Sequence, residues 1–88
     1  MNMDTLLKAA AGKSTEEWLV DGREAYRAVL AAIPNLQDRI IERIKTNPKF
    51  AEAEAAMDSG ESEATVLGQL VELGKAGLSA MLRLGLLG

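Results

Sequence analysis

Apolar residues recur at helical spacing through the last third of the chain. From residue 62 to residue 88 the sequence reads SEATVLGQLVELGKAGLSAMLRLGLLG. At about 100° per residue, its polar side chains gather on roughly a third of the helix circumference; these are Thr65, Gln69, Glu72, Lys75, Ser79 and Arg83. The pattern predicts a long, largely apolar helix over about 62–86, with Ser62 as its cap. Such a helix needs cover on most of its sides.

Capping and stop signals divide the first part of the chain into shorter helices. Gly12 suits the position after a first helix of about 4–11. Ser14 and Glu17 have the spacing of a capping box and predict a second helix over about 15–32. We expect its buried stripe to contain Trp18, Leu19, Ala25, Tyr26, Val29, Leu30 and Ile33.

Two prolines mark the next boundaries. Pro34 ends the second helix, because it disfavours the helical conformation of the residue before it. A third helix follows over about 36–46, and Asn47-Pro48 then begins a fourth over about 48–57. Strict alternation of apolar and polar residues is not sustained in any segment, so the sequence predicts no strands. We therefore expect a single all-α domain over 1–88, a small bundle of four to five helices.

The long helix also carries a heptad-like seam. Val66, Leu70, Leu73, Gly77, Ala80, Leu84 and Leu87 follow alternating spacings of four and three, as in coiled coils. Glycines beside this seam would let another backbone approach closely. The predicted interface therefore comprises Val66, Leu70, Leu73, Gly74, Gly77, Leu78, Met81 and Leu84, and a possible second interface comprises Trp18 and Tyr26.

Composition makes the cover of this helix the main question. In 88 residues the only aromatic residues are Trp18, Tyr26 and Phe50, and much of the apolar content is alanine, which buries little surface per residue. A core of this kind is thin in so short a chain, and association would stabilise it. Three arrangements stay open for the long helix: the centre of a monomeric bundle, an interface, or a lipid-facing element.

The residue types exclude several kinds of chemistry. The chain has no cysteine and no histidine, so thiolate metal sites, thiol nucleophiles and histidine bases are excluded. The acidic run between Glu52 and Glu63 lacks the spacing of a calcium loop, and Gly12-Lys13-Ser14 lacks the upstream glycine of a phosphate-binding loop. We therefore predict no catalytic residue, no cofactor and no metal.

These observations favour a non-enzymatic protein–protein interaction or assembly module: an adaptor, an inhibitor or a structural subunit that binds a partner or itself through the last helix. A membrane-associated helical protein is the alternative. A small helix-turn-helix DNA-binding regulator is a second one, disfavoured because the net charge is -3 and acids alternate with bases. The N-terminus has no secretory pattern, so we expect a cytoplasmic protein.

Overall fold

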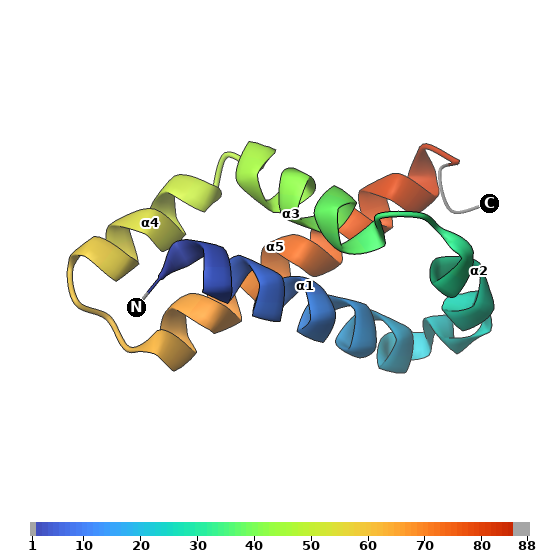
Figure 1. Cartoon of the computed structure of the whole chain (residues 1–88), viewed down its shortest axis with the longest axis horizontal. Helices are drawn as coiled ribbons and strands as arrows, with labels where there is room; N and C mark the ends of the chain where they lie inside the picture. The colour runs from blue at the N-terminus through green and yellow to red at the C-terminus, as the bar shows by residue number, and fades with distance from the viewer. Residues whose placement is uncertain (1, 86–88) are drawn as a thin grey trace.

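The computed structural model describes residues 2–85, and every regular element in that range is helical (Figure 1). This confirms the predicted all-α class. In chain order the elements are α1 (Met3–Trp18), the π-helical turn η1 (Leu19–Arg23), the 3-10 turn η2 (Glu24–Tyr26), α2 (Arg27–Ala32), α3 (Leu36–Thr46), α4 (Phe50–Asp58) and α5 (Glu63–Arg83).

Helix α5 is the element against which the others pack. It contacts α1, α3 and α4, and in Figure 1 it runs through the middle of the molecule, where α1 crosses it. The molecule measures 39 × 21 × 20 Å. The core contains Leu6, Leu7, Ala10, Ala11, Trp18, Leu19, Leu30, Ile40, Ile44, Ala53, Val66, Leu70, Val71, Leu73, Leu78 and Met81.

The predicted helix stop at Gly12 is wrong. Helix α1 continues through Gly12 to Trp18. Ser14, predicted as a cap, is instead fully buried within the helix. Its Oγ lies 2.6 Å from the carbonyl oxygen of Ala10 and 3.0 Å from that of Val71 on α5, and can donate its proton to either. A glycine inside a helix costs about 1 kcal/mol, and burial of one continuous apolar stripe against α5 outweighs that cost.

The predicted single helix over 15–32 is also wrong, because the chain breaks at Asp21-Gly22. Gly22 has φ 104° and ψ 11°, a conformation that favours glycine. The side chain of Asn2 caps α1 by accepting the Asp4 N–H at 2.8 Å.

The later boundaries lie close to the predicted ones. Helix α3 spans Leu36–Thr46, and α4 begins two residues after Pro48. Ser62 caps α5 by accepting the Thr65 N–H at 3.1 Å. Helix α5 ends at Arg83, and residue 86 of its predicted range and Leu87 of the heptad-like seam lie outside the described residues.

Candidate functional site

The predicted interface seam of α5 is packed inside the chain. Seven of its eight residues are buried: Val66, Leu70, Leu73, Gly74, Gly77, Leu78 and Met81. Leu84 is the exception, with 64% of its surface exposed. The seam faces α1 and α3, so in this conformation only Leu84 of the predicted set can meet a partner.

Small residues explain how alanine-rich α1 covers a leucine-rich helix. A Cβ added at Gly74 would overlap Ser14 Oγ and lie 2.7 Å from Ser14 Cβ, and a Cβ at Gly77 would lie 2.8 Å from Arg43 Cβ. Helices α1 and α3 therefore approach α5 closely where it has glycine. Ala10 and Ala11 are buried in the same core. Close approach allows these short side chains to make the contacts that longer ones make at wider spacing.

The second predicted site is divided between core and surface. Trp18 is only 2% exposed, and its Nε1–H donates to Ser79 Oγ on α5 at 3.0 Å. The Tyr26 ring lies 5.8 Å from the Trp18 ring, centroid to centroid, and the Arg23 guanidinium lies 5.3 Å from the same indole. Trp18 thus anchors the turn after α1 to α5, and the half-buried Tyr26 lies beside it.

Lys75 holds the break in the chain against α5. Its Nζ lies 2.9 Å from Asp21, 3.4 Å from Glu72 and 3.6 Å from Glu17. The hydrogen bond to the Asp21 carboxylate is the main reason that the pKa of Lys75 is raised above its ordinary value. This cluster links α1, η1 and α5. The charged residues beside the break therefore have a structural role.

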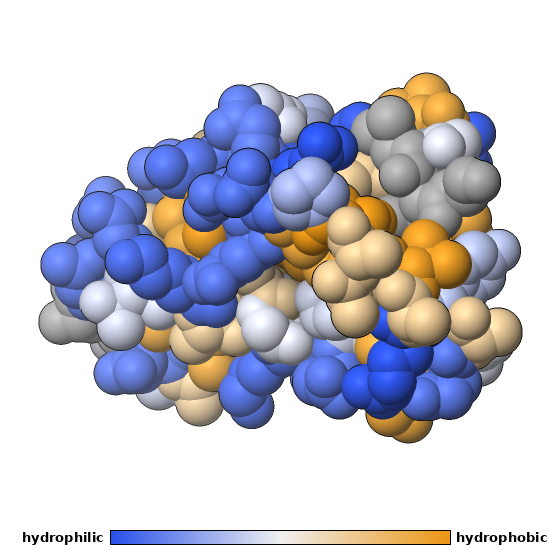
Figure 2. Space-filling model, turned by 45° about the vertical axis from the view of Figure 1, so that its right-hand side comes forward, coloured by the Kyte–Doolittle hydropathy of each residue, from blue (hydrophilic) through white to orange (hydrophobic). Residues whose placement is uncertain are grey.

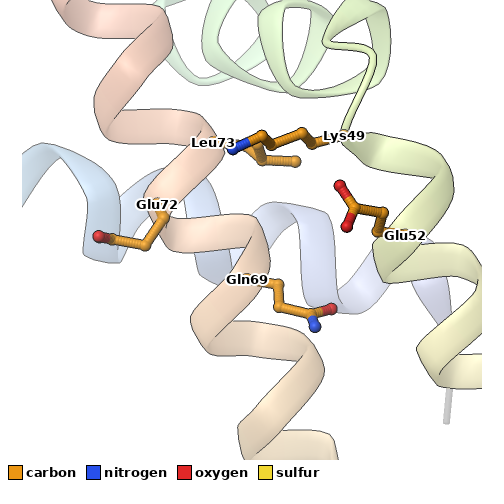
Figure 3. A pocket seen from close by; sticks show the side chains of 5 residues that line it. All are labelled: Lys49, Glu52, Gln69, Glu72 and Leu73. Carbon is orange, nitrogen blue, oxygen red and sulfur yellow. The ribbon is translucent and has the colours of Figure 1, made fainter.

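The predicted polar strip of α5 is exposed in part. Thr65, Gln69, Glu72 and Arg83 are exposed, whereas Lys75 and Ser79 are half-buried. Between α5 and α4 lies a hollow of about 250 Å³, lined by Lys49, Glu52, Gln69, Glu72 and Leu73. In Figure 3 the Glu72 side chain points away from α4, while Lys49 reaches across from the α4 side. The acids and the base do not gather around one point, and the hollow offers no catalytic arrangement.

Helix α2 is where sequence reasoning missed an exposed apolar surface. Of its residues Arg27–Ala32, only Leu30 is buried. Ala28, Ala31 and Ala32 are exposed, and Val29 is 38% exposed. A helix break assigned to Gly22 would have predicted this exposure. The single helix predicted over 15–32 instead assigned Val29 and Ile33 to the same buried stripe as Trp18.

The exposed residues of α2 and Leu84 lie at the same end of the molecule. Figure 1 places α2 and the C-terminal end of α5 at the same end of the molecule, and Figure 2 shows several apolar patches on this side. We call this surface the apolar end; it comprises Ala28, Val29, Ala31, Ala32 and Leu84. It therefore includes Leu84, the one exposed residue of the predicted seam, together with four residues of α2.

Neither chemistry nor similarity assigns an activity to the chain. Within residues 2–85, no three side chains of the His, Cys, Asp and Glu types form a group that could hold a metal ion. None of the described helices is both long enough and apolar enough to cross a membrane. No family model matches the chain, and neither a curated protein nor a solved structure matches it.

Proposed function

We propose that the chain is a non-enzymatic protein–protein interaction module, an adaptor, inhibitor or structural subunit, that associates through its apolar end. The observation that carries this proposal is the exposure of α2. A helix in which only Leu30 is buried leaves its valine and three of its alanines at the surface. Contiguous apolar surface of this kind is typical of protein interaction sites.

The residues of the apolar end suit contact with another helix. Alanine side chains form a smooth surface that a partner backbone can approach closely. Leu84 adds a larger side chain, 64% exposed, that can enter a groove on a partner. Arg27, which is ion-paired with Glu16 and Glu24, provides a polar edge beside the alanines. Association through the end of α5 thus retains only Leu84 of the predicted interface. The other residues of that seam belong to the core.

The test compares two alanine-to-lysine variants. Ala28→Lys places a charge within the apolar end. Ala55→Lys makes the same change at an exposed position of α4, at the other end of the molecule (Figure 1). Both changes lie at the surface, so we expect each to alter the free energy of unfolding by less than about 0.5 kcal/mol. We expect Ala28→Lys to abolish association and Ala55→Lys to leave it intact.

Light scattering over a concentration series measures association of the chain with itself. If the wild type is monomeric at every concentration, the test is quantitative capture of partner proteins instead of light scattering. The wild type, Ala28→Lys and Ala55→Lys are each immobilised for this comparison. Partners retained by the wild type and by Ala55→Lys but lost with Ala28→Lys support the proposal. A monomer whose captured proteins are the same for all three chains contradicts it.

A further inference from the structure

A hollow between the C-terminal ends of α3 and α5 contains basic side chains without acidic ones. It has a volume of about 230 Å³ and is lined by Arg43 and Thr46 of α3, Asn47, and Gly77, Ala80 and Arg83 of α5. Two arginines from different helices thus line one small space, and no acidic residue lines it.

The neighbouring hollows differ from this one. Lys49 shares its hollow with Glu52 and Glu72. Arg39 shares its hollow with Asp38 and Glu42, and Arg43 lines that hollow as well. In a chain with a net charge of -3, a hollow lined by two arginines and no acid is a local exception. Among residues 2–85, Arg43 and Arg83 make no ion pair with a carboxylate.

The position of Arg43 is fixed by packing. Its Cβ lies 2.8 Å from where a Cβ of Gly77 would be, so the absence of a side chain at Gly77 lets the stem of Arg43 lie directly against α5. Arg43 is accordingly half-buried. A guanidinium on a stem held in this way loses less conformational entropy when it binds an anion than one on a fully exposed side chain.

The ends of the two helices account for part of this arrangement. Basic residues in a last turn are stabilised by the helix dipole, and this applies to Arg43 and to Arg83 separately. The helix-dipole effect does not require the two arginines to line the same hollow. Two like charges repel each other there, and an anion between them offsets this repulsion. Thr46 Oγ donates to the Glu42 carbonyl oxygen at 2.9 Å, so this hydroxyl satisfies one carbonyl group of the last turn of α3.

We propose that this hollow binds a small oxyanion, a phosphate or carboxylate group, between Arg43 and Arg83. The planar, permanently charged guanidinium groups suit such anions because each can donate two parallel hydrogen bonds. This proposal is independent of the interaction function, since it rests on different residues and needs no partner protein.

The experiment is an NMR titration of the ¹⁵N-labelled full chain. Inorganic phosphate and succinate are added separately at constant pH and ionic strength, with sodium chloride as the reference salt. We expect saturable shifts of the Gly77 and Ala80 amide signals with at least one oxyanion and none with chloride. Whichever oxyanion binds more tightly identifies the preferred group.

Matched arginine variants locate the binding. Arg83→Gln changes an exposed side chain and should weaken binding roughly tenfold, the loss expected for a charge-assisted contact. Arg43→Gln keeps the stem against Gly77 and should do the same. Arg39→Gln removes a charge from α3 outside the hollow and should leave affinity unchanged. Non-saturable shifts, or equal weakening by Arg39→Gln and Arg83→Gln, would overturn the site.

Discussion

Two glycines of α5 show how differently one residue type can serve in the same helix. Gly74 faces Ser14 so closely that a Cβ would overlap the serine hydroxyl, whereas a Cβ at Gly68 would meet no atom within 4 Å. Both glycines lower helix propensity by about 1 kcal/mol relative to alanine. At Gly74 the contact between α1 and α5 offsets that cost, while at Gly68 no contact among the described residues does.

The same substitution should therefore have opposite effects at these positions. We expect Gly74→Ala to lower the free energy of unfolding by about 1–3 kcal/mol through overpacking, and Gly68→Ala to raise it by about 1 kcal/mol. Urea unfolding followed by circular dichroism measures both. A stabilising Gly74→Ala would mean that α1 and α5 are not in contact at Ser14.

Lys75 gives a prediction for alkaline pH. Its pKa is raised above the ordinary value of 10.5, mainly by the hydrogen bond to Asp21. Because the folded state holds this proton more tightly, the stabilisation is fully present below the unfolded pKa and is lost as pH rises through the folded one. The difference in unfolding free energy between wild type and Lys75→Gln should therefore be constant near neutral pH and shrink in alkaline solution.

Lys8→Gln is the control for this measurement, because Lys8 makes no ion pair within residues 2–85. Its difference from wild type should not change in the same way. If the two variants show the same dependence on pH, the Lys75 cluster does not stabilise the fold.

At the scale of elements, the end of α1 is decided at Gly22 rather than at Gly12. Gly22 has φ 104°, so Gly22→Ala should lower the unfolding free energy by about 1–2 kcal/mol. Gly12 is exposed within α1, and a Cβ there would meet no atom within 4 Å, so Gly12→Ala should raise it by about 1 kcal/mol. Thermal unfolding of both variants tests this assignment, which a destabilising Gly12→Ala would contradict.

Capping residues and prolines predicted some helix boundaries well and others wrongly. The caps and prolines around α3, α4 and α5 act within a few residues of themselves, so the sequence placed those helices closely. Ser14 is different, because its role depends on the carbonyl oxygen of Val71, 57 residues away. Its spacing to Glu17 was that of a capping box, and no local pattern distinguishes a cap from a serine buried against a distant helix.

The candidate site shows the same limit. Helical periodicity grouped the residues of α5 that are buried together, but two residues of the predicted polar strip, Lys75 and Ser79, are half-buried. It could not say what covers the apolar face, because that depends on how closely α1 and α3 approach Gly74 and Gly77. The exposed side of α2 depends in turn on the break at Gly22, since a continuous helix would have turned Val29 toward the core.

For the whole molecule, the position of the apolar end has its own importance. It lies at one end of a molecule 39 Å long, so a partner bound there leaves the polar strip of α5 and the surface of α4 accessible. Self-association through this end would join two chains end to end and give a longer particle. Small-angle scattering of any dimer would distinguish that shape from side-by-side packing.

The core is built largely from the first and last helices, α1 and α5. During synthesis on the ribosome, Leu6, Leu7 and Trp18 emerge early, but their cover is not made until residues 63–83 have followed. The nascent chain therefore exposes these apolar residues until α5 has been synthesised. Contacts between residues so far apart in sequence also slow folding relative to helical proteins with local contacts. Helices α1 and α5 can therefore pack together only after α5 has left the ribosome.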